Sequence, residues 1–341
     1  MISLDSSNIG ELEKEYVIRC LEDGEVSTRG KWVEKFEKTM AKYLNVPDTV
    51  AVNSGTSALH LCLLTLGIGP DDEVIIPALT FCATYNVVKY VGAIPIIVDI
   101  DIDTWCMDFQ KVSTEITEKT KAIMPVTLYG NAYDVSVIIE RIPIILDACE
   151  SLGTKTIDNF PIEHYGEYAV LSFNGNKTMT TAGGGLVVGK NLDKIRLLSQ
   201  QAKANNLDLV GYNYRMTAFS AALGMAQLKR LPSFIKRKKK IREIYENELG
   251  NLVTFQKASP YSDPCWWLNA CLIPENYELS YVMKKLDKAK IPHRRIFKPL
   301  ASLPNAQYIY DHGFCLPSST LCTDKDIMFV CQTIKEILSG K

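Results

Sequence analysis

The stretch EVIIPALTFCATYNVVKYVGAIPIIVDI, residues 73–100, contains two short apolar runs with a helical pattern between them. The runs EVIIP and IPIIVDI are rich in β-branched residues and lack polar alternation, which is typical of strands that are buried on both faces. The segment ATYNVVKYVG between them has helical spacing. This stretch therefore predicts a strand–helix–strand unit in an α/β fold, with a mostly parallel sheet between layers of helices.

The same alternation extends to both sides of this stretch. Two amphipathic helices are predicted before it, in IGELEKEYVIRCLEDG, closed by Gly24, and in KWVEKFEKTMAKYL. A helical pattern also lies in SALHLCLLTLG, and further strands are predicted in TVAVN, KAIMPVT, IPIILDA, YAVLSF and GLVV. After about residue 230 the pattern changes to a long charged helix, FIKRKKKIREIYENELG, followed by mixed strands and helices. We predict a large domain over residues 1–230 and a smaller α+β domain over residues 231–341.

Composition excludes several classes of protein. The chain has 341 residues and a formal net charge of −1, which argues against a broad electrostatic surface for nucleic acid or anionic membranes. Its ten cysteines form no CxxC pair and lie in apolar runs, so we expect reduced core residues instead of disulfides or metal ligands. The N-terminus lacks a signal pattern, and no apolar run reaches membrane-spanning length. We expect a soluble cytoplasmic protein.

Three pieces of sequence carry candidate chemistry. In VNSGTSALHL a strand is followed by a tight turn and a helix that opens at Gly55, Thr56 and Ser57, where free amides and hydroxyls can bind an anion; an ordinary helix N-cap is the alternative. In LDACESLGT an apolar strand places Asp147 at its end, either as a helix cap or as the partner of a buried cation. In SFNGNKTMTTAGGG, residues 172–185, Lys177 stands alone among small residues before a run of glycines.

This combination fits one cofactor well. Pyridoxal phosphate (PLP) needs a phosphate site, a carboxylate on its pyridine nitrogen and a lysine for the Schiff base. A lysine that acts as a nucleophile needs its ammonium form disfavoured, by desolvation or by a neighbouring cation. An anion site, a strand-end aspartate and an isolated lysine occur here in that order along an α/β pattern.

These motifs resemble the DegT/DnrJ/EryC1/StrS family of sugar aminotransferases. The resemblance covers nearly the whole chain and rests on VSTRGKWVEKFE, NSGTSALHL, LYGN, LDACESLGT, SFNGNK, AGGGLVV, GYNYRMTAFSAALGMAQL and CLPSS. It implies a fold-type-I, aspartate aminotransferase-like architecture and a homodimer. Some family members have histidine in place of the lysine and eliminate a hydroxyl, so Lys177 implies transamination.

The resemblance also implies a role for each matching position. Lys177 should bond to the cofactor and move the proton, and Asp147 should pair with the pyridine nitrogen. Phe81 should stack on the cofactor ring, unless it is a plain core residue. Glu150 should approach the ring hydroxyl, where it would have to be protonated or bridged. The phosphate should be bound by Gly55, Thr56, Ser57 and Ser172, with Asn213 reaching it from the partner subunit. Asn213 could instead belong to a simple helix N-cap loop before the small-residue helix 217–228.

The substrate is the least constrained part of this interpretation. The resemblance implies L-glutamate as amino donor and a nucleotide-linked ketosugar as acceptor. The SFNGNK and TTAGGG forms favour amination at C4 of a UDP-linked 4-keto-6-deoxy-N-acetylhexosamine, with GDP-perosamine-type and dTDP-ketosugar enzymes, or C3 amination, as alternatives. A non-catalytic regulator that kept the fold is a further alternative. Candidate substrate contacts are Arg29, Tyr214, Arg294 and Arg295. In IPHRRIFKPLASL, His293 and Arg295 depart from the family pattern, and Arg295 either reaches a diphosphate or is solvated.

Overall fold

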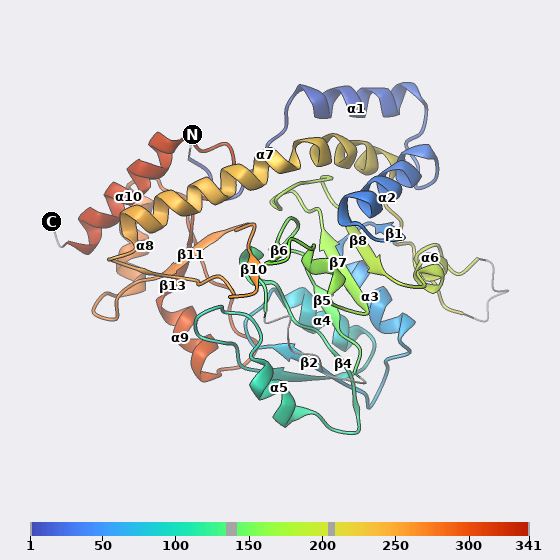
Figure 1. Cartoon of the computed structure of the whole chain (residues 1–341), viewed down its shortest axis with the longest axis horizontal. Helices are drawn as coiled ribbons and strands as arrows, with labels where there is room; N and C mark the ends of the chain where they lie inside the picture. Colours follow the sequence, from blue (N-terminus) through green and yellow to red (C-terminus); the bar gives the residue numbers. More distant parts are fainter. Residues whose placement is uncertain (1, 134–141, 204–208, 340–341) are drawn as a thin grey trace.

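The computed structural model of the chain describes residues 2–133, 142–203 and 209–339 (Figure 1). Its centre is a three-stranded sheet of order β3-β2-β4 and a four-stranded sheet of order β1-β8-β7-β5. Parallel bridges from Ile123 to Ile144 and from Val126 to Asp147 join the two into one layer. All pairings in this layer are parallel except those of β8, which runs antiparallel to both neighbours, so the predicted mostly parallel sheet is confirmed. The strands are β1 Thr49–Val52, β2 Glu73–Pro77, β3 Ile94–Val98, β4 Thr120–Ile123, β5 Ile145–Asp147, β7 Tyr168–Ser172 and β8 Gly185–Gly189.

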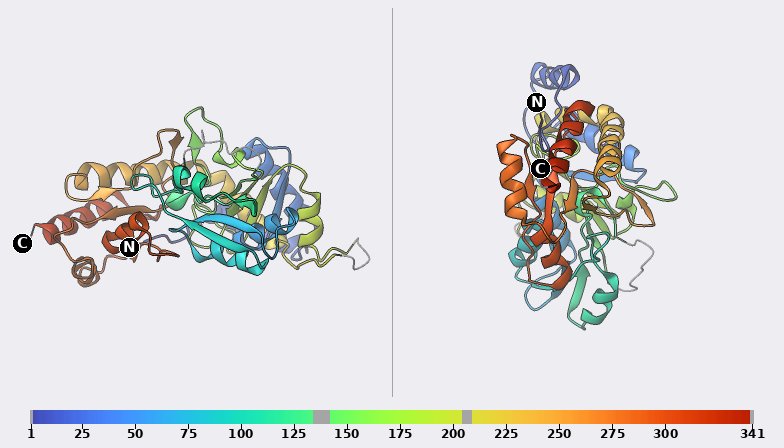
Figure 2. Two further views of the ribbon diagram at one scale, coloured as in Figure 1. Left: turned by 90° about the horizontal axis from the view of Figure 1, so that it is seen from below. Right: turned by 90° about the vertical axis from the view of Figure 1, so that its left-hand side faces the viewer.

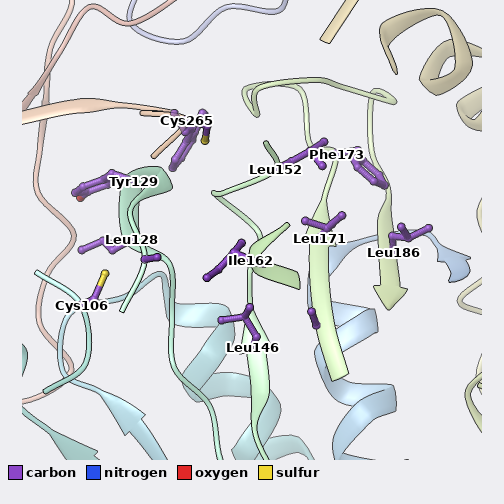
Figure 3. Close-up of a cluster of buried hydrophobic side chains, with 14 of the residues drawn as sticks. Cys106, Leu128, Tyr129, Leu146, Leu152, Ile162, Leu171, Phe173, Leu186 and Cys265 are labelled. Carbon is purple, nitrogen blue, oxygen red and sulfur yellow. The ribbon is translucent and has the colours of Figure 1, made fainter. Parts of the chain in front are cut away.

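The central strands are buried on both faces. Leu146 of β5 and Leu171 of β7 belong to one hydrophobic cluster, together with Ile162 and Leu186 (Figure 3). Their chain neighbours Ile145 and Val170 belong to a second cluster on the other side of the sheet. Successive side chains of a strand point to opposite faces, so apolar residues at every position require cover on both sides. This explains why these strands lack polar alternation.

Helices supply that cover. The predicted helix–strand alternation is confirmed, including the two N-terminal helices and the left-handed residue Gly24 (φ 69°) that follows the first. The helices of this part are α1 Glu11–Glu22, α2 Lys31–Leu44, α3 Gly55–Thr65, α4 Cys82–Tyr90, α5 Phe109–Glu115 and α6 Asp193–Ser199, with the short 3-10 turns η1 Leu128–Gly130 and η2 Ile162–His164.

One long helix, α7, crosses the molecule from the central sheet to the C-terminal part (Figures 1 and 2). It spans Ala218–Leu249 with Pro232 inside it. The sequence predicted two helical segments on either side of Pro232, and the structure merges them. The predicted domain boundary at residues 230/231 therefore lies within a single helix, and the division into two domains stays a prediction.

The C-terminal part is an antiparallel sheet with helices packed on it, an α+β arrangement as predicted. Its strand order is β12-β13-β11-β9, and a separate two-stranded antiparallel sheet pairs β10 of this part with β6 from earlier in the chain. The N-terminal segment returns to this part, since the Ser318 amide donates to the Leu4 carbonyl. The elements are β6 Lys155–Thr156, β9 Thr254–Phe255, β10 Ser262–Asp263, β11 Asn269–Leu272, β12 Arg294–Arg295, β13 Gly313–Leu316, α8 Leu279–Lys288, α9 Pro304–His312 and α10 Asp324–Leu338.

Two composition-based expectations can be compared with the structure. Of the ten cysteines, all except Cys82 and Cys149 are buried, in agreement with their expected core positions. Among the described residues, no helix combines the length and the apolar character that crossing a membrane requires.

Candidate active site

A cavity of about 270 Å³ lies at the carboxyl ends of the central strands. Asn53, Phe81, Asp147 and Ser172, which line it, follow or end β1, β2, β5 and β7. The carboxyl ends of parallel strands meet at one edge of a sheet, where α/β proteins commonly bind ligands. The C-terminal part closes the cavity from the other side with Trp267, among other residues. The cavity therefore combines polar strand ends with an aromatic cover.

The N-terminus of α3 lies in the wall of the cavity. Ser54 caps the helix by accepting from the Ser57 amide (3.0 Å), and the Ser57 hydroxyl donates to Asn53 Oδ1 (2.7 Å). Gly55 and Thr56 line the cavity, and their amides belong to the first turn, which has no intrahelical partners for them. A Cβ on Gly55 would lie 2.6 Å from Cys149 Sγ, so a larger residue here would have to displace the Cys149 side chain. Ser54 is thus an ordinary N-cap, while anion binding at Gly55 and Thr56 stays a prediction.

Asp147 is buried beside this turn, with a side chain held at both oxygens. Its Oδ2 accepts from the Thr84 hydroxyl (2.8 Å) and its Oδ1 from the Cys149 amide (3.3 Å). It is 5% exposed and lines the cavity. Thr84 is itself tied to Thr80 by a hydroxyl contact of 2.9 Å. The two hydrogen bonds from Thr84 and Cys149 fix the orientation of the Asp147 carboxylate. A carboxylate that pairs with a single ring nitrogen needs such a fixed orientation.

Lys177 is isolated in the sequence but not in space. Its Nζ lies 3.3 Å from Glu150 Oε1 and 3.9 Å from the centre of the Trp267 ring. The Trp267 indole donates to the Asn176 carbonyl (2.6 Å), which fixes the ring over the lysine. Lys177 thus enters the cavity between a carboxylate and an aromatic face, an arrangement in which cation–π attraction and ion pairing both act.

Glu150 contacts both Lys177 and the backbone at Tyr129, and its role at the ring hydroxyl stays a prediction. Its Oε2 accepts from the Tyr129 amide (2.8 Å) while Oε1 meets Lys177. Burial raises the pKa of Glu150, and the nearby Lys177 charge and the Tyr129 amide offset this in part. The backbone at Tyr129 is left-handed (φ 56°), which aims its amide at the carboxylate.

Phe81 is not a core residue. It is 52% exposed, lines the cavity and lies 5.7 Å from Phe297, centre to centre. A phenyl face that borders a cavity without being packed in the core is available for stacking on a planar ligand.

The candidate substrate arginines separate into different environments. Arg294 lines the cavity, where its Nη1 lies 3.8 Å from Asp5 and its Nε and Nη2 are buried without a partner among the described residues. Arg295 instead packs on Tyr310 and lies 3.7 Å from Asp311, outside the cavity lining. His293 is buried beside Phe314 and contacts the Ile291 carbonyl (2.9 Å). Of this predicted set, Arg294 is the residue that faces the site.

Four further predicted residues do not line this cavity in their own chain. One is Ser57, whose hydroxyl is used by Asn53. Arg29 lines a separate cavity near the start of α2. The Tyr214 hydroxyl lies 3.3 Å from His60 Nδ1. Asn213 is exposed, and its carbonyl accepts from the Asn53 side chain (3.3 Å). The contacts predicted for these residues with cofactor or substrate stay predictions. For Asn213, the predicted contact is with the active site of the partner subunit.

Sequence reasoning missed the residues that hold the site together. Trp267, Thr84 and Asn176 were not among the candidates, although each contacts a predicted residue or its immediate neighbour. For Trp267, the sequence did offer a signal in the doublet Trp266–Trp267. Tryptophan side chains contribute large contact areas in cores and at binding surfaces, so two in a row suggest such a place. Thr84 has no comparable signal.

The residues present fit pyridoxal phosphate. Gly55, Thr56 and Ser172 offer donors for a phosphate, Asp147 offers a fixed carboxylate and Lys177 offers an amine, all in one cavity. This donor set suits a phosphorylated, nitrogen-containing ring better than a metal ion, and the described residues contain no group of three or more potential metal ligands.

Known proteins resemble the chain over nearly its whole length. The GDP-perosamine synthase of Escherichia coli O157:H7 is 36% identical, over 96% of each chain. That of Caulobacter vibrioides is 34% identical, over 99% of this chain and 98% of the relative. Among solved structures, the PLP form of a putative sugar aminotransferase from Streptococcus pneumoniae superimposes with a TM-score of 0.93, at 27% identity and 99% coverage of both chains.

The family description that matches the chain extends from residue 7 to residue 335. It includes every residue that lines the cavity. The fold-type-I architecture, the PLP cofactor and aminotransferase activity follow from this match and from the relatives. The chain belongs to the DegT/DnrJ/EryC1/StrS aminotransferase family.

Proposed function

We propose that this aminotransferase moves the amino group of L-glutamate to the C4 carbonyl of a nucleotide-linked 4-keto-6-deoxy sugar, as a cytoplasmic homodimer. The observation that carries the proposal is the meeting of Lys177, Glu150 and Asp147 in one cavity beside the α3 N-terminus. A regulator without catalysis would not need this buried charged set, because buried charges are costly unless they are used or well paired.

When bound, PLP supplies an aldehyde that carries nitrogen and a ring that accepts electrons. Gly55, Thr56 and Ser172 would hold its phosphate, and Phe81 would pack on its ring. Asp147, kept in place by Thr84, would hold a proton on the pyridine nitrogen. Lys177 would anchor the group and move the proton at the reacting carbon, and Trp267 would keep water from the lysine. Arg294 lines the cavity and has no full complement of partners among the described residues, so its guanidinium would bind an anionic group of a substrate.

The relatives favour a GDP-linked acceptor. Two relatives that match nearly the full chain are GDP-perosamine synthases, from Escherichia coli and Caulobacter vibrioides. The UDP-linked N-acetylhexosamine predicted from the SFNGNK and TTAGGG forms remains the second candidate, supported by those motifs alone. We therefore place the GDP-linked 4-keto-6-deoxy sugar first.

Incubation of the holoenzyme with glutamate and a panel of UDP-, GDP- and dTDP-linked 4-ketosugars tests this order. Mass spectrometry should detect the amine in place of the carbonyl oxygen most rapidly with the GDP-linked sugar. Faster amination of the UDP-linked sugar would reverse the order of the candidates. Failure with every sugar, in a protein that binds PLP, would contradict the proposed reaction.

We also propose that each active site takes Asn213 from the partner subunit. In its own chain Asn213 is exposed and outside the cavity lining, whereas Lys177 and Asp147 line it. The small-residue start of α7, just after GYNYRM, is suited to close packing against another surface.

Mixed dimers should show this sharing. Lys177→Ala and Asn213→Ala homodimers are unfolded together, refolded and assayed. If sites are shared, each heterodimer has one doubly substituted site and one site that is wild type at both positions, so activity should rise above the parental average, toward half of wild type per heterodimer. If Asn213 serves its own chain, every site carries one substitution and activity stays at the average. That result would reject the shared site without affecting the aminotransferase assignment.

A further inference from the structure

Residues 3–8, here called the N-terminal strap, precede α1 and contact the loop that carries Lys177. The Ser7 hydroxyl donates to the Gly175 carbonyl of that loop. The Asn8 carbonyl accepts from a glutamine side chain of α7 (2.9 Å). These bonds hold the strap in place directly behind the active site.

Asp5 is the acid of the strap that reaches the active-site residues. Its Oδ2 accepts from the Asn176 side chain (2.9 Å) and lies 3.8 Å from Arg294 Nη1. Asn176 and Arg294 both line the active-site cavity, whereas Asp5 itself does not. Asn176 directly precedes Lys177 in the chain. The Asp5 carboxylate is therefore fixed between the loop of the reactive lysine and an arginine of the cavity wall.

Arg294 has one nitrogen that a ligand in the cavity can reach. Its Nε and Nη2 are enclosed by protein, while the side chain as a whole is 33% exposed, so the accessible nitrogen is Nη1. Nη1 is also the nitrogen next to Asp5. A separation of 3.8 Å permits ionic attraction but is too long for a hydrogen bond. The carboxylate of a ligand could therefore bind Nη1 more closely than Asp5 does.

The two substrates of the enzyme differ in charge. In the proposed function, on which this assignment rests, the cavity takes in turn an amino acid, which carries carboxylates, and a ketosugar, whose sugar ring is uncharged. An arginine that binds a carboxylate of the amino donor loses that partner when the sugar ring takes the donor's place. A cation that is shielded from water and unpaired is costly, so the arginine needs another counter-ion at that stage.

We propose that Asp5 is a specificity-determining residue that acts as the counter-ion of Arg294 while an uncharged group occupies the cavity. When the amino donor binds, its carboxylate replaces Asp5 as the partner of Arg294 Nη1. One arginine can then serve an acidic and a neutral substrate in the same place. Asp5 improves the binding of the neutral substrate and weakens that of the acidic one, because it competes with the donor carboxylate.

Calorimetric titration of the PLP-loaded enzyme with two unreactive probes tests this role. Glutarate and glutaramide have the same carbon skeleton, but glutarate carries two carboxylates and glutaramide two uncharged amides. In Asp5→Asn, glutarate should bind more tightly, since no carboxylate competes for Arg294, and glutaramide more weakly, since Arg294 has no counter-ion. We expect the preference for glutarate over glutaramide to increase at least about tenfold. The asparagine has nearly the shape of Asp5 and can still accept from Asn176.

Two further variants show whether the effect passes through Arg294. Arg294→Gln removes the cation, so the preference for glutarate should fall, and adding Asp5→Asn should then change it by less than about twofold. Asp311→Asn is the matched control, because Asp311 lies 3.7 Å from the adjacent arginine, Arg295, outside the cavity lining. It should leave the preference of wild type unchanged.

The outcomes separate this role from the proposed reaction. An unchanged or lower preference in Asp5→Asn would overturn the role of Asp5, and so would an equal increase when Arg294 is already replaced. Probe binding requires no turnover. If the probes behave as expected but glutamate and the ketosugars do not react, the proposed substrates are wrong and the role of Asp5 at Arg294 stands.

Discussion

Replacing Lys177 by alanine should slow turnover by more than about 10⁴-fold, because the variant loses both the amine that bonds to the cofactor and the base that moves the proton. The side chain is 13% exposed and has no other lysine beside it among the residues that line the cavity. The phosphate and pyridine contacts of the site do not involve Lys177, so the variant should still take up PLP and bind aminated sugar. Steady-state kinetics and the absorption spectrum of the purified variant measure these two properties separately.

Two controls separate chemistry from damage to the fold. Lys190→Ala removes an exposed lysine and should leave activity unchanged. Added ethylamine should restore part of the lost proton transfer in Lys177→Ala, because a free amine can enter the space that the side chain leaves. Normal turnover by Lys177→Ala would exclude the assignment of this residue.

The Asp147→Asn variant should bind PLP but react on the order of 10² to 10⁴ times more slowly. The amide has nearly the same shape, so it can still accept from Thr84, but it carries no charge to keep the pyridine nitrogen protonated. The ring then accepts electrons less well. We expect the substitution to lower kcat much more than it lowers the affinity for PLP. Steady-state kinetics measure kcat, and equilibrium dialysis measures the affinity for PLP.

A matched variant at an exposed acid, Asp158→Asn, should have wild-type kinetics. If Asp147→Asn itself stays within about twofold of wild type, the side chain serves only as a strand-end cap through its contact with the Cys149 amide. The two interpretations therefore differ by at least a factor of about 50 in kcat.

The central fold was predictable because its signals are local. Most strands of the central sheet are short runs dominated by apolar residues, because parallel strands that are covered on both faces need apolar side chains on both. The antiparallel direction of β8 has no such signal, since direction depends on the path of the connecting loop. The continuity of α7 was missed for a related reason: Pro232 disfavours a helix interior locally, but packing of the helix on both sides of it outweighs that cost.

The site residues that belong to local sequence motifs could be predicted. Those that reach the site only through contacts between distant segments of the chain could not. Lys177, Asp147 and the α3 turn could be named from their own sequence neighbourhoods. Trp267 lies 3.9 Å from Lys177 although many residues separate them in the chain, and no local pattern specifies such a contact. Arg294 and Arg295 are adjacent in sequence, yet strand alternation sends one side chain to the cavity and the other to Tyr310.

The long helix α7 sets a mechanical condition on the enzyme. With 32 residues it is about 48 Å long, and it joins the sheet that carries Lys177 to the part that carries Trp267 and Arg294. If the site opens by separation of these two parts, α7 has to rotate or bend. Its weakest point is Pro232, which cannot donate to the carbonyl four residues earlier, so bending strain would concentrate there. Substrate entry and release would then depend on the stiffness of a helix turn at Pro232, which does not line the active-site cavity.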